Sequence, residues 1–322
     1  MKKINTLLTR MLFCLLSLSL VFSIYGVYKW IDFFPNRLKI GTSYMTMDNH
    51  FYRILNNEIA TIIDRHDDIL YTRNPALSVD KQCQQIQDFM AKKVDAIIIN
   101  PVDSSSSKLI KVLKVAKNQG IKIIVVDSQL SDSRIADTTI VSDNYDAGAL
   151  IAKDMMTRLR QAKIVLLEHE QTLSGRDRIN GFLDTIKDNS NYDVIVRRQT
   201  LGQPELAMSQ INEVISEGLS FDLIMALNDR SALGALAAVQ SQKLSPPPYI
   251  YGIDGSPEIK SLIRISDDIT ATVGQSPIAI GKFAITSAYR LLEKKSVEDK
   301  QVVPVFLIDK DNINQYDVMG WQ

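Results

Sequence analysis

The sequence predicts an α/β fold with two similar Rossmann-like lobes, parallel sheets, a hinge between the lobes, and a transmembrane helix before them. First, short apolar runs such as residues 96–99 end abruptly at a polar residue, which is typical of strands buried on both faces of a parallel sheet. Second, these runs alternate with amphipathic helical stretches, the pattern of βα units. Third, the series restarts near residue 145, and 322 residues exceed what one hydrophobic core usually serves.

The N-terminal segment predicts a membrane anchor. Basic residues precede an uncharged run from Met11 to Tyr28, and Lys29 follows it. Such a run is just long enough to span a bilayer, and the positive residues before it place the N-terminus inside. A cleaved signal peptide is the alternative, but no alanine of an A-x-A cleavage site occurs before residue 35. We therefore expect a signal anchor over residues 1–30 and a linker over residues 31–38.

The first series of elements begins after this linker. Its strands are recognised by β-branched runs and its helices by one apolar face, and serines that can cap a helix open the third helix, which Gly120 ends. The expected strands are residues 39–44, 69–72, 96–99, 121–126 and 138–141, and the expected helices are residues 51–65, 79–93 and 104–118.

The second series repeats the pattern. The expected strands are residues 163–167, 194–198, 223–227, 249–253, 271–274 and 302–308, and the expected helices are residues 145–159, 176–188, 205–217, 231–242, 257–265 and 277–294. We assign residues 39–142 and 255–273 to lobe 1, and residues 143–254 and 274–322 to lobe 2.

Composition excludes some classes of function. The formal net charge is zero, which gives no support for a nucleic-acid partner. Cys14 and Cys83 lie in different kinds of segment, so no disulfide is expected. The three histidines are scattered without an HExxH or CxxC motif, so we expect no zinc and no cofactor.

Polar residues at predicted strand ends form the candidate site. In open α/β sheets ligands bind at the carboxyl ends of the strands. Flat carboxylate, amide and guanidinium groups can each meet two sugar hydroxyls, and aromatic faces suit the apolar side of a sugar ring. Each residue alone is also explained as a helix cap or turn residue. The candidates are Asn100, Asp127, Asn228, Asp254 and Gln275 at strand ends, Arg176 at a helix start, and the aromatic residues Phe51 and Tyr52.

Eight segments give this pattern a family resemblance. They are DNHFY (48–52), DAIIINPVDS (95–104), IVVD (124–127), VSDN (141–144), GRDRINGF (175–182), NDRSALGAL (228–236), YGIDGSPE (251–258) and VGQSP (273–277). The sequence resembles the ribose-binding branch of the bacterial periplasmic sugar-binding proteins, which have the type I periplasmic binding protein fold. Lactose-repressor-type regulators share that fold in their ligand-binding part.

The resemblance implies a role for each candidate residue. Phe51 and Tyr52 would sandwich the ring, and Asn49 would add a polar contact. By the same resemblance, hydroxyl groups would be bound from lobe 1 by Asn100 and Asp127, from lobe 2 by Arg176 and Asn228, and near the hinge by Asp254 and Gln275.

Three positions depart from the ribose binders. Met45 replaces a serine or threonine, Ser128 replaces an arginine, and Gln203 replaces an aromatic residue. These changes remove polar contacts to the sugar and an aromatic face that would stack on its ring, so a different pentose or a hexose fits as well as ribose.

The expected function is therefore a membrane-anchored, extracytoplasmic receptor that closes around a monosaccharide. Its partner would be an ABC-type permease or a sensor histidine kinase. A lactose-repressor-like regulator is the alternative, but a hydrophobic run stands where the basic DNA-binding domain should be. A sugar-processing enzyme is disfavoured because no G-x-S-x-G motif occurs and His169, between two glutamates, is expected in a solvated loop.

Overall fold

The computed structural model describes residues 13–26 and 37–321. The chain divides into two units, Met1–Leu38 and Lys39–Gln322. In the first unit residues 13–26 are helical, and the rest of the expected span from Met11 to Tyr28 lies outside the described residues. Among the described residues, no helix is both long and apolar enough to cross a bilayer.

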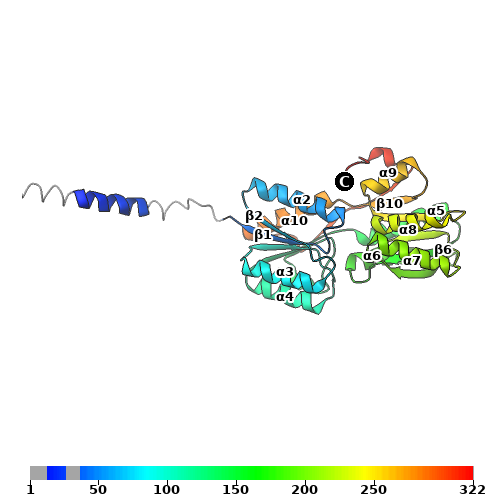
Figure 1. Ribbon diagram of the computed structural model, residues 1–322, viewed down its shortest axis with the longest axis horizontal. Coiled ribbons are helices and arrows are strands. Elements are labelled where there is room, and N and C mark those ends of the chain that lie inside the picture. Colours follow the sequence, from blue (N-terminus) through cyan, green and yellow to red (C-terminus); the bar gives the residue numbers. More distant parts are fainter. Residues whose placement is uncertain (1–12, 27–36, 322) are drawn as a thin grey trace, which may run out of the picture. The chain divides into compact units, whose positions relative to one another are not determined.

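The second unit consists of two α/β lobes (Figure 1). Lobe 1 has a six-stranded, wholly parallel sheet of order β11-β5-β4-β3-β1-β2. Its elements are β1 (Lys39–Ser43), α2 (His50–Arg65), β2 (Ile69–Arg73), α3 (Val79–Ala91), β3 (Ala96–Ile99), α4 (Ser107–Asn118), β4 (Lys122–Val126), the 3₁₀ turn η1 (Ser133–Ile135), β5 (Thr138–Ser142), α10 (Pro277–Leu292) and β11 (Lys300–Val303).

Lobe 2 repeats this architecture with the order β12-β10-β9-β8-β6-β7, in which only the edge strand β12 pairs antiparallel among the strands described. Its elements are α5 (Asn144–Arg158), β6 (Ala162–Glu168), α6 (Leu173–Ile186), β7 (Tyr192–Gln199), α7 (Pro204–Ser216), β8 (Leu223–Ala226), α8 (Asp229–Gln242), β9 (Tyr249–Asp254), α9 (Pro257–Ile265), β10 (Ala271–Gly274), β12 (Phe306–Asp309) and the 3₁₀ turn η2 (Ile313–Gln315). The predicted two-lobe α/β fold with largely parallel sheets is confirmed.

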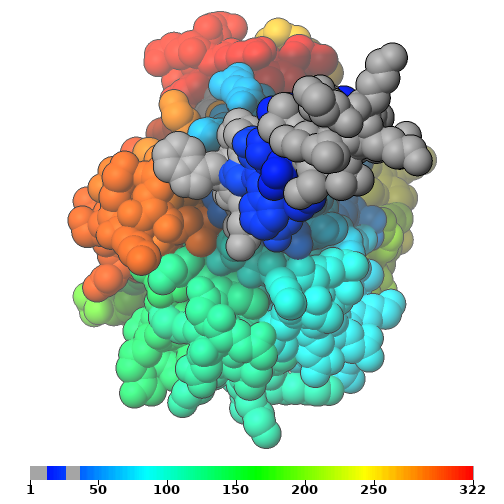
Figure 2. Space-filling view, turned by 90° about the vertical axis from the view of Figure 1, so that its left-hand side faces the viewer, coloured from blue at the N-terminus to red at the C-terminus, as the bar shows by residue number. Residues whose placement is uncertain are grey.

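The lobe assignment of the last third of the chain differs from the sequence expectation. Residues 255–273 belong to lobe 2, because β10 pairs in parallel with β9. Helix α10 instead returns to lobe 1, where Ile280 and Ala284 pack into the same core as Ile40. Figure 2, which looks onto lobe 1, shows this returning segment in orange at the surface of the lobe.

The expected single strand over residues 302–308 is in fact two strands in different lobes. Strand β11 ends at Val303 and β12 begins at Phe306, so the chain passes from one sheet to the other through Pro304. Proline has no N–H to donate to a ladder, which favours such a break. With the crossings after β5 and after β10, three segments join the lobes and form the hinge region.

Both faces of each sheet are covered by helices, and this explains the solid apolar strands. Lobe 1 has one core under α2 and α10 and another under α3 and α4. Lobe 2 likewise has one under α7 and α8 and one under α5 and α6. All four residues of β3 are fully buried, as its sequence predicts.

Candidate functional site

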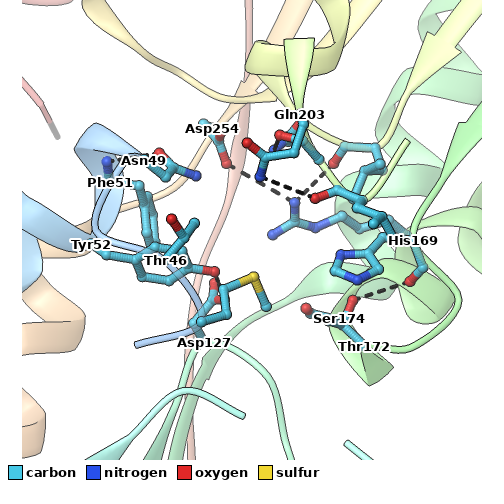
Figure 3. Close-up of a pocket in the computed structure, with 16 residues that line it drawn as sticks. Thr46, Asn49, Phe51, Tyr52, Asp127, His169, Thr172, Ser174, Gln203 and Asp254 are labelled. Carbon is cyan, nitrogen blue, oxygen red and sulfur yellow. Dashed lines mark hydrogen bonds and ion pairs between the residues drawn. The ribbon is translucent and has the colours of Figure 1, made fainter. Parts of the chain in front are cut away.

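A cavity lies between the lobes, where the carboxyl ends of the two sheets face each other (Figure 3). The space between its lining atoms is about 450 Å³, part of it open to solvent. The lining residues are Met45, Thr46, Asn49, Phe51, Tyr52 and Asp127 from lobe 1, and His169, Thr172, Ser174, Arg178, Leu201, Gly202, Gln203, Leu227, Asn228 and Asp254 from lobe 2.

The first turn of α2 supplies an aromatic wall. Asn49 caps this helix by accepting a hydrogen bond from the Phe51 backbone N–H (3.0 Å), so one residue serves both as cap and as part of the lining. The Phe51 and Tyr52 rings meet edge to face at 5.5 Å between centroids. Tyr44 stacks on Tyr52 at 5.8 Å, and Trp321 from the C-terminal segment lies edge-on to Phe51 at 5.7 Å. Other aromatic residues therefore support the two rings that line the cavity.

Asp127 presents a buried carboxylate at the end of β4. Its backbone adopts a left-handed conformation with φ of 64°, which aspartate tolerates better than most residues. The Tyr52 hydroxyl and the Asn100 amide both donate to Asp127 Oδ2, at 3.0 and 3.1 Å. Burial raises the pKa of this carboxyl, and the positive charge of Arg178 partly opposes that effect. The second oxygen, Oδ1, has no hydrogen-bond partner in the described part of the chain, so it can accept one from a ligand.

Asn100 lies behind Asp127 and does not line the cavity. Its side chain is fully buried, and its Oδ1 accepts a hydrogen bond from the Met45 backbone N–H at 3.1 Å. With the second contact to Asp127, this amide joins the ends of three neighbouring strands of lobe 1. Asn100 thus holds Asp127 and the loop after β1 in place.

Arg178 of α6 is the arginine in the cavity. Its Nε donates to Asn144 Oδ1 and its Nη1 to the Leu227 carbonyl, each at 2.8 Å, and Nη1 lies 4.0 Å from Asp254 Oδ1. Its second terminal nitrogen, Nη2, has no hydrogen-bond partner among the described residues. The guanidinium group is therefore fixed in orientation and keeps one donor end for a ligand.

Arg176, the arginine that the sequence pointed to, lies elsewhere. Two helical positions differ by about 200° around the axis, so both arginines cannot face the cavity. Arg176 donates to Ser105 Oγ (3.3 Å) and lines a separate depression with Arg197 and Glu168. Helix α6 begins at Leu173 instead of residue 176, and its starting point could not be resolved from the sequence.

Asp254 and Asn228 complete the lobe 2 side. Gln275 donates to Asp254 Oδ1 at 2.7 Å from behind the cavity, which it does not line. Burial and the nearby carboxyl of Asp229 raise the pKa of Asp254, while Arg178 opposes them. Asn228 caps α8 through Ser231 N–H (2.9 Å).

Sequence reasoning missed His169 as a lining residue. It was expected in a solvated loop, but only 4% of its surface is exposed and it lines the cavity. Burial lowers the pKa of its imidazole, so the ring is neutral at physiological pH. His169 directly follows β6, and the rule that strand ends carry the site would have found it. Met45 and Gln203, two of the departures, also line the cavity.

The lobes touch each other directly beside the cavity. Leu173 N–H donates to Ser104 Oγ (3.0 Å) and Ser174 N–H to Ser128 Oγ (3.1 Å), so two serines of lobe 1 accept from the first turn of α6 in lobe 2. The two hydroxyl groups are 3.1 Å apart and also bond each other. We call Ser104, Ser128 and these two N–H groups the serine latch.

A second contact closes the opposite side of the cavity. Arg230 of α8 donates to the Asp48 carbonyl of lobe 1 at 2.6 Å and to Gln203 Oε1 at 3.1 Å. The structure therefore has the lobes in contact on two sides of the cavity, a closed arrangement. In residues 13–26 and 37–321, no group of three or more His, Cys, Asp or Glu side chains is placed to hold a metal ion.

Comparison with known proteins identifies relatives over most of the chain. The model of the periplasmic binding protein domain matches residues 40–296. The putative rhizopine-binding protein of Rhizobium meliloti is 26% identical over 286 residues, covering 86% of this chain and 92% of that protein. The ribose import binding protein of Bacillus subtilis is 27% identical over 271 residues, covering 83% and 86%. The matched proteins are solute-binding proteins rather than enzymes.

Solved structures share the fold. An ABC transporter solute binding protein from Mycobacterium smegmatis, with bound glycerol, has a TM-score of 0.83 at 24% identity and covers 89% of this chain and 100% of that one. One from Bacillus halodurans, with bound myo-inositol, has a TM-score of 0.81 at 20% identity and covers 87% and 97%. At these identities the likeness establishes the fold alone.

Proposed function

This chain belongs to the periplasmic binding protein domain family, and on that premise we propose that it is an extracytoplasmic receptor for a monosaccharide-sized polyol. One observation carries the proposal: an aromatic wall, two carboxylates and a guanidinium group converge on one cavity between two lobes. Aromatic faces suit the C–H side of a ring, and fixed carboxylate and guanidinium groups suit pairs of hydroxyls. The relative from Bacillus subtilis that is named for ribose import supports this class of ligand.

The roles of individual residues follow from the geometry. Phe51 and Tyr52 contact one face of the ring, and Asp127 and Arg178 bind hydroxyls through Oδ1 and Nη2, which have no partner among the described residues. Asn49, Asn228 and Asp254 add contacts from the remaining sides. Asn100 and Gln275 act indirectly, by holding Asp127 and Asp254.

The mechanism is closure of the two lobes about the hinge. A ligand that touches both lobes favours the closed form over the open one by its differential affinity. The serine latch and the Arg230 contact to Asp48 form in the closed arrangement and add to that preference.

A membrane partner would bind the closed form of the receptor in preference to the open form. Two relatives support an ABC-type permease, since one is named a ribose import binding protein and the other an ABC transporter solute binding protein. A sensor histidine kinase is the other partner, for which a membrane-tethered receptor is well suited. We further propose that residues 11–28 anchor the chain with the receptor outside the cell. Mass analysis of the protein from cells tests the anchor, which a mature chain beginning near residue 30 would rule out.

The proposed function is tested by isothermal titration calorimetry of the full chain in detergent. The panel contains pentoses, hexoses, cyclitols and their amino derivatives. We expect saturable binding of at least one compound, with the Arg178→Ala variant losing it and the Arg176→Ala variant retaining it. Absence of binding across the panel would refute the sugar-receptor assignment while leaving the fold intact.

A further inference from the structure

The positive and negative charges of the groups that line the cavity do not cancel. They are two carboxylates, Asp127 and Asp254, and one guanidinium, Arg178; His169 is neutral. A third buried carboxyl, Asp229, lies behind Asp254 and raises its pKa. The ligand cavity is therefore negative by at least one charge when its carboxyls are ionised.

Of the two carboxylates, Asp127 is the one that the guanidinium group does not contact. Arg178 Nη1 lies 4.0 Å from Asp254, which places the one guanidinium beside that carboxylate. Within the part of the chain that the structure describes, no cationic group lies within 4.0 Å of Asp127. Its two donors, the Tyr52 hydroxyl and the Asn100 amide, are neutral, and both bind Oδ2. Asp127 Oδ1 thus remains for a ligand, on a buried carboxylate that no protein cation contacts among the described residues and that Arg178 affects only at longer range.

The next residue in the chain cannot supply the missing charge. Ser128 carries no charge, and its hydroxyl bonds to Ser174 N–H and to the Ser104 hydroxyl in the serine latch. Because Ser128 is fully buried in this contact, neither solvent nor a long cationic side chain has room there. Closure of the lobes therefore removes water from Asp127 without bringing a protein cation into contact with it, because the charge of Arg178 acts on this carboxylate only from beyond hydrogen-bond distance.

We propose that the ligand itself supplies the cation. Resting on the proposed function, this inference narrows the ligand to an amino sugar or aminocyclitol whose ammonium group donates to Asp127 Oδ1. An ionised carboxylate that loses water without a counterion is costly, and a charge-assisted hydrogen bond from an ammonium group offsets that cost better than a hydroxyl does. Phe51, Tyr52 and Arg178 would hold the ring and its hydroxyls as in a neutral sugar.

The test compares matched ligands by calorimetry on the full chain at pH 7. Each set contains an amino compound, its hydroxyl counterpart and its N-acetyl derivative, for example D-galactosamine, D-galactose and N-acetyl-D-galactosamine, with gluco, manno and inositol sets alongside. We expect the tightest binder to be a free amine, at least tenfold tighter than both neutral members of its set. A neutral compound that binds as tightly as or more tightly than every amine overturns this inference and leaves the receptor function standing.

The Asp127→Asn variant separates charge from shape. Asparagine is isosteric, tolerates the left-handed backbone at this position and can still accept from Tyr52. We expect it to weaken the amine at least tenfold and to reduce the preference over the hydroxyl counterpart to less than threefold. Asp132→Asn, a carboxylate of the same lobe outside the cavity, is the matched control and should change neither value. If Asp127→Asn left the preference for the amine over its hydroxyl counterpart unchanged, the amine would bind elsewhere and the inference would be refuted. If neither the amines nor the neutral compounds bound to the unaltered protein, the receptor function would be refuted as well.

Discussion

Removing the serine latch should weaken ligand binding without unfolding either lobe. In the double variant Ser104→Ala, Ser128→Ala, the N–H groups of Leu173 and Ser174 lose their acceptors in the closed form. They belong to the first turn of α6, whose N–H groups have no partners within the helix. In an open form water would satisfy these groups, so the substitutions penalise the closed form selectively.

The expected magnitude follows from two neutral hydrogen bonds. Each contributes about 0.5–1.5 kcal/mol net, so the double variant should shift the equilibrium toward the open form by about 1–3 kcal/mol. If the ligand-free protein is mainly open, this corresponds to a dissociation constant raised roughly 5- to 150-fold.

Calorimetry with the best ligand measures this effect, and urea denaturation without ligand checks that the fold is retained. The control is Ser107→Ala, an exposed serine in the first turn of α4 that makes no contact with lobe 2 among the hydrogen bonds described. A dissociation constant within twofold of the unaltered protein would show that the latch contributes nothing to closure.

Three further predictions concern the site and its support. Arg178→Ala should abolish binding and lower the free energy of unfolding by about 3 kcal/mol, because it leaves Asp254 without its cation. Arg176→Ala should change neither value, and the two variants are compared by urea denaturation and by titration with the ligand. Burial raises the pKa of Asp229 to about 6, above its unfolded value, so its contribution to stability is present below pH 4 and is lost as the pH rises through 6. Urea denaturation from pH 4 to 7 should show a fall of about 3 kcal/mol from this group, and Asp229→Asn should lack it. Gly148→Ala would place a Cβ 1.8 Å from the Arg178 carbonyl oxygen and push α5 away from α6, so the free energy of unfolding should fall by about 3 kcal/mol or more. An unchanged urea midpoint would contradict that packing.

The βα pattern predicted the two lobes and their sheets, because solid apolar strands between amphipathic helices have few other ways to be buried. It could not say which sheet a strand joins. Strand β10 pairs with β9 in lobe 2, while the following helix α10 packs on lobe 1, and the pattern along the chain is the same in either case. Lobe membership depends on pairing between distant segments, which a local pattern does not record.

The candidate site was likewise predicted only in part from the sequence. The strand-end rule placed Asp127, Asn228 and Asp254 beside one cavity, and the same residues also form caps and turns, so the two explanations coexist. The rule did not separate a residue that faces the cavity from one that lies behind it, as Asn100 lies behind Asp127.

By itself, then, the sequence determined the order of elements, the edge of each sheet where polar groups gather, and the aromatic pair at Phe51 and Tyr52. Only the tertiary structure decided that Arg178 instead of Arg176 faces the cavity. Helix α6 starts three residues before the start expected from the sequence, and the sequence alone did not show which side of this helix faces the other lobe. The contact of Ser128 with the first turn of α6 was likewise out of reach, because two lobes separated in sequence meet there. Depth, helix rotation and contact between lobes are properties of packing, and they are set by residues far apart along the chain.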